Sequence, residues 1–180
     1  MSRILVTYAT RLGSTAEVAD LIATVLGGEG RQVEVQPIES IQHVKDYDAV
    51  VVGSAIRGGK WLPHAVEFLE KHQAALAQKP LAYFTVCMTM ADDSPESHEV
   101  AESYHDVLFR SYPSLQPMSI GMFAGAFDSG KVSPLIKLLA RGMGIPEGDW
   151  RDWESISDWA RDLSLALSAS LEMERASAQG

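Results

Sequence analysis

The sequence predicts a doubly wound α/β domain with a five-stranded parallel sheet in the order 2-1-3-4-5 and an insertion after the fifth strand. Runs of apolar residues recur along the chain, as expected of strands that are buried on both faces. Segments of helical periodicity lie between most of these runs, and this alternation produces a parallel sheet covered by helices. The predicted strands span residues 3–8, 32–37, 49–54, 81–88 and 118–126.

A turn rich in hydroxyl groups connects the first strand to a helix predicted at 14–27. Such a turn directs backbone N–H groups and the positive end of the helix dipole to one place, which suits a phosphate. Gly13 is its only glycine, so the turn is neither a GxGxxG loop nor a nucleotide-triphosphate loop. Hydroxyl groups must then do much of the binding, with charge at the rim, unless they merely cap the helix. The candidate residues are Thr10, Arg11, Leu12, Gly13, Ser14 and Thr15.

The third strand leads into a loop with two adjacent glycines, Gly58 and Gly59, and Pro63 then marks the first turn of a helix at 64–78. Adjacent glycines let the backbone reorient beside a flat ligand. Trp61 either borders such a ligand or packs into the core after a hairpin-like turn. The candidate residues here are Ser54, Ala55, Ile56, Arg57, Gly58, Gly59 and Trp61.

The fourth strand ends in a third loop, which precedes a helix predicted at 95–112. Its candidate residues are Cys87, Met88, Thr89 and Met90. Thr89 is a candidate hydrogen-bond donor, whereas the only cysteine is more often an inert buried thiol than a nucleophile. Ligands of doubly wound folds bind outside the carboxyl ends of the strands, where the strand order reverses. The three loops are therefore predicted to converge on one ligand.

The last third departs from the minimal pattern through an insertion at 128–149. Ser133 can cap and Pro134 can start an amphipathic helix. The apolar face of this helix comprises Leu135, Ile136, Leu138, Leu139 and Met143, and nearby basic residues are Lys131, Lys137 and Arg141. A helix at 154–170 follows, so that one domain is predicted at 1–171 and a flexible tail at 172–180.

The chain is acidic, with a formal net charge of −9, which argues against nucleic acid as a partner. Six of the acidic residues lie in the segment 92–106. His98 and His105 flank Glu102 there, but a solvated face is favoured over a metal site. No apolar run is long enough to span a bilayer and no signal peptide is evident, so a cytoplasmic location is expected.

Two other classes that use α/β folds lack their required residues. A Ser-His-Asp hydrolase is excluded because the sequence has no GxSxG elbow. A phosphoacceptor receiver domain needs acidic residues at the ends of strands one and three, where this chain has Thr10 and Ser54.

The stretch from Tyr8 to Thr15, YATRLGST, resembles the FMN phosphate loop of the flavodoxin family. The resemblance departs from the family only at Thr7, where an apolar strand residue is usual. It implies FMN as the cofactor, and it implies that Gly58 and Gly59 provide the peptide that responds to the redox state of the flavin.

A narrower resemblance covers nearly the whole chain. The segments GSAIRGGKW, FAGAF, IKLLARGMG and DWESISDWA are similar to those of the menaquinone-dependent protoporphyrinogen dehydrogenases and their flavodoxin-domain relatives. This implies a quinone acceptor, a porphyrinogen substrate and peripheral contact with the inner face of the cell membrane through 133–143. In that family the segment after the fifth strand is rich in arginine and tyrosine, whereas here it reads DSGKVSPLIKLLARGMG. A flavodoxin-like carrier that serves a redox protein partner, and a module that has lost its flavin, remain alternatives.

Overall fold

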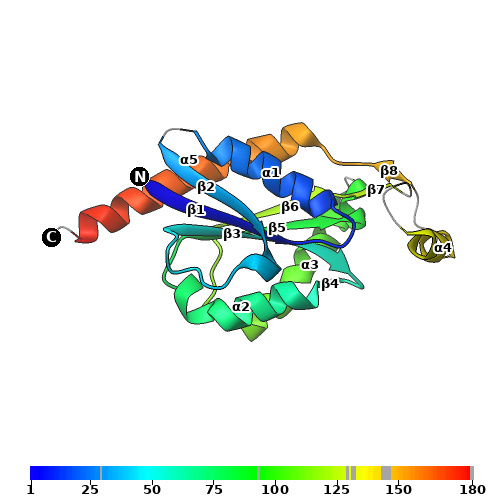
Figure 1. Cartoon of the computed structure of the whole chain (residues 1–180), viewed down its shortest axis with the longest axis horizontal. Coiled ribbons are helices and arrows are strands. Elements are labelled where there is room, and N and C mark those ends of the chain that lie inside the picture. The colour runs from blue at the N-terminus through cyan, green and yellow to red at the C-terminus, as the bar shows by residue number, and fades with distance from the viewer. Residues whose placement is uncertain (29, 93, 129, 131–132, 143–146, 179–180) are drawn as a thin grey trace.

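The computed structural model describes residues 1–28, 30–92, 94–128, 130, 133–142 and 147–178, except for the side chains at 136, 139, 140 and 178. Its main sheet is parallel and has the order β2-β1-β3-β5-β6 (Figure 1). This order confirms the predicted 2-1-3-4-5 arrangement, because the short β4 (Lys60–Trp61) pairs antiparallel to β3 outside the series. The parallel strands are β1 (Ser2–Ala9), β2 (Arg31–Pro37), β3 (Ala49–Arg57), β5 (Leu81–Cys87) and β6 (Ser119–Ala124).

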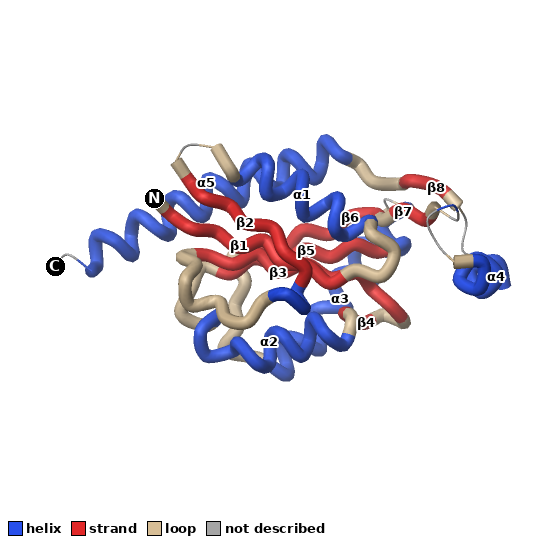
Figure 2. Tube along the Cα trace, in the orientation of Figure 1, coloured by secondary structure: helices blue, strands red, loops and turns tan. Residues whose placement is uncertain are grey.

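Helices cover both faces of the sheet (Figure 2). Helices α1 (Ser14–Leu26) and α5 (Trp153–Ala178) pack on one face, and α2 (Pro63–Leu76) and α3 (Pro95–Ser111) pack on the other. Each face has its own apolar core, and the central strands separate the two cores. The fold is therefore the predicted three-layer, doubly wound domain.

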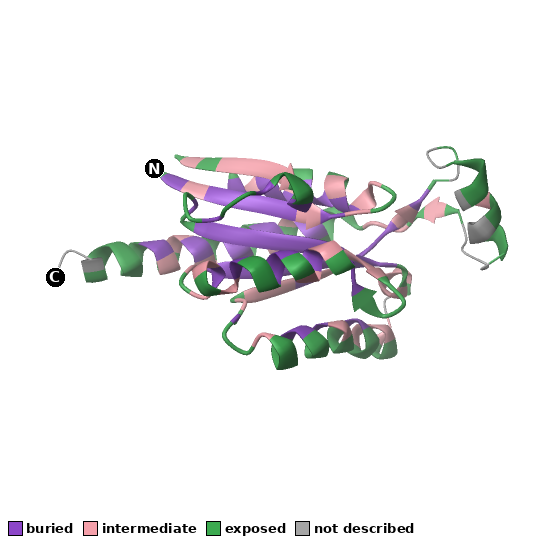
Figure 3. Cartoon of the chain, turned by 60° about the horizontal axis from the view of Figure 1, so that its bottom comes forward, coloured by how far each residue is buried: buried purple, intermediate pink, exposed green. Residues whose placement is uncertain are grey.

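The central strands are continuous runs of apolar residues because their side chains point alternately into the two cores, one on each face of the sheet. All seven residues of β5 are buried, and the first six residues of β3 are buried as well (Figure 3). The edge strand β2 is only partly buried. Helix α3 begins where Ser94 accepts a hydrogen bond from the Ser97 N–H at 3.2 Å, which is a standard N-cap.

The predicted fifth strand is interrupted at Gly125. Strand β6 ends at Ala124, and β7 (Ala126–Phe127) then pairs antiparallel with β8 (Gly148–Asp149). This small hairpin forms the base of the insertion. Helix α4 (Pro134–Gly142) stands away from the sheet, at the same end of the molecule as the carboxyl ends of the strands (Figure 1). The predicted contributions of Lys131 and Met143 lie outside the described residues, as do the side chains of Ile136 and Leu139.

Helix α5 continues to Ala178, beyond the predicted domain end at residue 171. Leu171 is buried, and Arg175 Nη2 donates to Ser2 Oγ at 3.1 Å, which ties the end of the helix to the start of β1. The segment predicted as a tail from residue 172 is thus helical as far as Ala178. Residues 179–180 lie outside the described part of the chain.

Candidate cofactor site

Three loops leave the sheet side by side at the carboxyl ends of β1, β3 and β5. The strand register fixes this arrangement, because Ala9 lies opposite Ser54 and Ala55 lies opposite Val86. The first loop is 10–15, the second is 55–60 and the third is the 3-10 turn η2 (Met88–Ala91). The structure therefore brings together the three segments that the sequence singled out.

The first loop is shaped by Thr10 and Gly13. The Gly13 N–H donates to Thr10 Oγ1 at 3.0 Å, and Gly13 has a φ of +92° as the N-cap of α1. Thr10 Oγ1 accepts this bond, so its own proton remains available to donate. Arg11 and Leu12 are exposed at the rim, whereas Ser14 is half-buried at the first position of the helix.

Thr15 supplies the strongest local indication of a ligand. Thr15 is fully buried, yet its Oγ1 has no hydrogen-bond partner within the described residues. A buried hydroxyl without a partner is normally costly. Here it lies in the first turn of α1, where backbone N–H groups and the helix dipole favour an anion. Thr10, Thr15 and the helix terminus therefore fit a phosphate group.

The second loop is a tight hairpin turn between β3 and β4. Gly58 and Gly59 have φ values of +57° and +73°, and Arg57 pairs with Lys60 on either side of them. Two consecutive residues with positive φ form the two-residue turn that hairpins favour, which explains the double glycine. Ala55 and Ile56 are half-buried, whereas the turn itself and Arg57 are exposed.

Ser54 has a structural role in this loop. Its Oγ donates to the Ala55 carbonyl at 2.8 Å and accepts from the Leu62 N–H at 3.0 Å. Leu62 is the N-cap residue of α2. The Ser54 hydroxyl thus fixes the return of the chain after the hairpin, and it is fully buried.

Trp61 packs into the core, and its ring therefore does not lie at the surface of the loops, where it would border a ligand. The residue is 4% exposed, and its Nε1–H donates to Thr85 Oγ1 at 3.1 Å. Its ring packs edge-on against Tyr83 and His105. The alternative of a hairpin-like turn with a core tryptophan is the arrangement found.

His105 is also buried, at 1% exposure, and does not belong to a solvated face. Its Nε2 lies 2.9 Å from Thr85 Oγ1, and its Nδ1 lies 3.3 Å from the Glu102 carbonyl. The Glu102 carbonyl can only accept, so in the neutral ring the proton lies on Nδ1 and the Thr85 hydroxyl, which accepts from Trp61, donates its own proton to His105 Nε2. Burial lowers the pKa of His105 and favours this neutral form.

The third loop combines a buried thiol with more accessible residues. Burial raises the pKa of Cys87, as expected of an unreactive cysteine. Met88 is exposed, and Thr89 and Met90 are half-buried. Thr89 Oγ1 is hydrogen-bonded to the Tyr104 hydroxyl at 2.7 Å.

Two residues at this site were missed by sequence reasoning. A Cβ on Gly125 would lie 3.8 Å from Ser14 Oγ and 3.9 Å from Met88 Sδ, so this position brings the chain after β6 close to two of the loops. Tyr104 of α3 contacts the second loop at Gly59 and the third loop at Thr89. The sequence held no local signal for either residue, because the interruption at Gly125 depends on the pairing of β7 with β8 and the pattern of α3 does not single out Tyr104.

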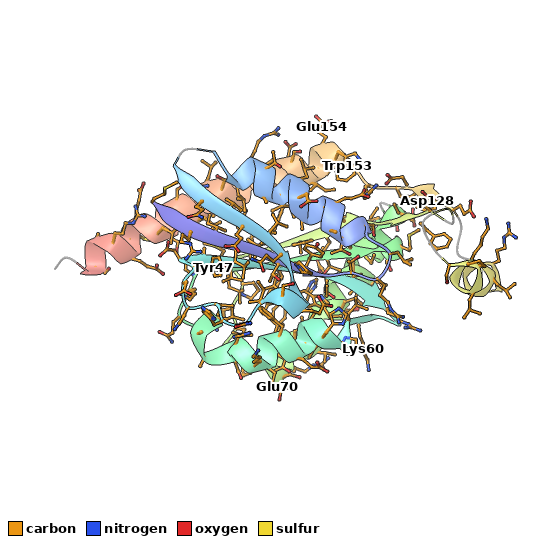
Figure 4. The ribbon with its side chains drawn as sticks, viewed as in Figure 1. Tyr47, Lys60, Glu70, Asp128, Trp153 and Glu154 are labelled. Carbon is orange, nitrogen blue, oxygen red and sulfur yellow. The ribbon has the colours of Figure 1, made fainter. Side chains whose placement is uncertain are left out.

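A hollow of about 390 Å³ adjoins the first loop and the base of the insertion. Arg151 lies in it and forms ion pairs with Glu17 of α1 and Asp149 of β8. Asp128 lies at the end of β7, on the side facing α4 (Figure 4). The arginine therefore links the insertion hairpin to the helix that follows the first loop.

The fold and the three converging loops define a protein of the flavodoxin type, a class that binds FMN. A sequence profile described as a flavodoxin domain matches residues 5–142, and the chain belongs to this family. The domain is thus an FMN-binding, flavodoxin-type oxidoreductase. FMN chemistry requires partners that supply and accept electrons.

Curated relatives are similar over most of the chain. A protein named protoporphyrinogen IX dehydrogenase [quinone] from Escherichia coli strain K12 is 28% identical over 174 residues, which is 90% of this chain and 94% of that protein. A protein of the same name from Leishmania major is 24% identical and covers 90% of this chain and 74% of its own length. Among solved structures, an archaeal flavodoxin matches with a TM-score of 0.58 and 17% identity, covering 92% of this chain and 99% of its own.

Proposed function

We propose that this protein is an FMN-dependent dehydrogenase that oxidises a porphyrinogen and passes the electrons to a quinone. The observation that carries the proposal is the similarity to a protein named protoporphyrinogen IX dehydrogenase [quinone], which extends along 94% of that protein's length. Bound FMN supplies the redox chemistry, accepting hydrogen from the substrate and delivering electrons to the quinone.

In this proposal, the three loops hold the cofactor. Thr10 and Thr15 donate hydroxyl protons to the phosphate, with backbone N–H groups from Gly13, Ser14 and the first turn of α1. The remaining loop residues border the flavin or fix the loops that do, as Ser54 does through Leu62. Trp61 and Cys87 are buried, so in this proposal they support the loops from the core and do not touch the flavin.

The insertion is the proposed contact region for the quinone and for the inner face of the cell membrane. Leu135 and Leu138 of α4 are 66% and 69% exposed, and Arg141 is exposed beside them. Exposed leucines beside basic residues suit an interface between headgroups and acyl chains. In the described part of the chain, no helix is both long and apolar enough to cross a bilayer.

A second candidate function is a flavodoxin-like carrier that exchanges electrons with a redox protein. Acidic residues line the exposed part of α3 and the segment before it, beside the third loop, and a partner of complementary charge would dock there. These exposed residues are Asp92, Glu96, Glu99, Glu102 and Asp106.

The experiment that separates the two functions follows porphyrin formation under anaerobic conditions. Purified protein loaded with FMN is mixed with protoporphyrinogen IX, with and without a menaquinone analogue. The dehydrogenase proposal predicts porphyrin fluorescence that continues over many turnovers only with the quinone. A flavin that undergoes reduction and reoxidation with chemical donors but never turns over the porphyrinogen would favour the carrier.

A further inference from the structure

We infer that Tyr104 is a positioning residue that holds the second and third cofactor loops at a fixed separation. Tyr104 lies on α3, outside the three loops, and contacts both the second loop and the third loop. The inference concerns the cofactor and rests on the proposed FMN loops, whereas the identity of the electron donor and acceptor does not enter it.

The two contacts of Tyr104 are of different kinds. Its hydroxyl is hydrogen-bonded to Thr89 Oγ1 of η2 at 2.7 Å. Its ring lies against the hairpin turn, because a Cβ on Gly59 would be 3.6 Å from Tyr104 Cε1 and 3.9 Å from Cδ1. One rigid side chain thus spans the gap between the turn and η2.

The helix that carries Tyr104 is itself fixed at this position. The next residue, His105, is buried and hydrogen-bonded to Thr85 of β5, and Thr85 accepts from Trp61 of β4. The turn of α3 at His105 is therefore tied to β5, which precedes the third loop, and through Thr85 to β4, which follows the second loop. These hydrogen bonds restrain the backbone of the helical turn that carries Tyr104.

The surroundings of Tyr104 indicate a local role. The residue is half-buried, and it is a member of neither core cluster formed by the described residues. Its removal should therefore change the loops more than the global stability. Tyr112, the C-cap residue of the same helix, instead packs against the core that α2 and α3 form with the sheet. It lies at the opposite end of α3 from the third loop.

The test compares Tyr104→Phe and Thr89→Val, which each remove the hydroxyl contact, with the double variant and with Tyr112→Phe as a matched control. FMN affinity of the apoprotein and the midpoint potential of the bound flavin are measured, together with unfolding by urea. Each single variant should raise the Kd for FMN about threefold to tenfold and shift the potential. The double variant should match the singles, because both remove one interaction.

Three results would overturn the inference. The first is a Tyr104→Phe protein with wild-type affinity and potential. The second is a double variant whose effects are the sum of the single effects, which would mean that the two hydroxyls act independently. The third is a loss of urea stability as large as the loss of affinity, which would indicate a general packing role. Absence of FMN binding by the wild-type protein would instead overturn the cofactor loops and this inference together.

Discussion

At the scale of single residues, Thr15 gives the proposed phosphate position its most direct support. Its buried Oγ1 has no hydrogen-bond partner among the residues that the structure describes, although a hydroxyl left unpaired in a protein interior costs about 1–3 kcal/mol. Valine would fill nearly the same space without a polar atom. The residue is therefore poorly suited to the interior by itself and well suited to a phosphate at the start of α1.

Replacing Thr15 by valine should separate binding from stability. Thr15→Val is expected to weaken FMN binding about tenfold, because a charge-assisted hydrogen bond to phosphate is lost. The stability of the apoprotein should stay the same or rise. Thr24→Val on the same helix is the control, since Thr24 Oγ1 donates to the Asp20 carbonyl at 2.8 Å, within the helix and remote from the loop. Fluorescence titration and urea unfolding measure both quantities, and unchanged affinity in Thr15→Val would contradict the phosphate assignment.

His105 should make the protein acid-sensitive. Burial lowers its folded-state pKa below the ordinary value of 6.5, partly opposed by the Glu102 carbonyl and the Asp106 carboxylate. Because the folded-state pKa is lowered, the stability due to the neutral ring is complete above pH 6.5 and is lost as the pH falls from there through the folded-state pKa. His72, whose pKa burial also lowers, acts in the same direction.

The expected result is that His105→Gln flattens the decline in stability below about pH 6.5. Urea unfolding at a series of pH values measures this, with His98→Gln on the same helix as the control. A His105→Gln protein that declines as steeply as the wild type would show that the buried ring does not govern the acid limb.

At the scale of elements, the close contact between β3 and β5 depends on Gly53. A Cβ at this position would lie 2.0 Å from the Phe84 ring, and Phe84 is fully buried. The ring has no free space in which to move, so Gly53→Ala should lower the free energy of unfolding by about 1–3 kcal/mol or more. Gly28→Ala is the control, because its added Cβ would meet nothing within 4 Å. Equal urea midpoints for the two variants would contradict this packing.

Helix α4 gives the second prediction at this scale. Changing both Leu135 and Leu138 to serine should reduce binding to anionic lipid vesicles and turnover with a membrane-embedded quinone, because two exposed apolar side chains are lost. FMN affinity should not change. Vesicle sedimentation and the anaerobic porphyrin assay measure these effects. If binding and turnover both persist in the double variant, the insertion does not serve as the proposed contact region.

The sequence allowed the elements to be predicted where local pattern governs them. The apolar run of β5 and the proline at the first position of α2 place those elements within a residue or two. The interruption at Gly125 and the extension of α5 were not predictable in this way. The first depends on pairing between β7 and β8, and the second on a contact between Arg175 and Ser2, residues far apart in the chain.

At the scale of the whole molecule, parallel topology explains why the site could be predicted at all. The loops after β1, β3 and β5 meet because the strand order makes these strands neighbours. Topology does not reveal which side chains turn inward. The burial of Trp61 and His105 in the core was therefore not evident from the topology. The contact of Tyr104 with the third loop from α3 was not evident either, because no spacing rule along the chain indicates it.

We propose that one FMN is held jointly by the loops at 10–15, 55–60 and 88–91. Hydrogen–deuterium exchange of the apoprotein with and without FMN tests it most directly, since bound loops exchange more slowly. FMN should protect peptides from all three loops together, while exchange in the β7–β8 hairpin and in the outer turns of α2 should change little. Protection confined to other segments, or of one loop without the other two, would contradict it.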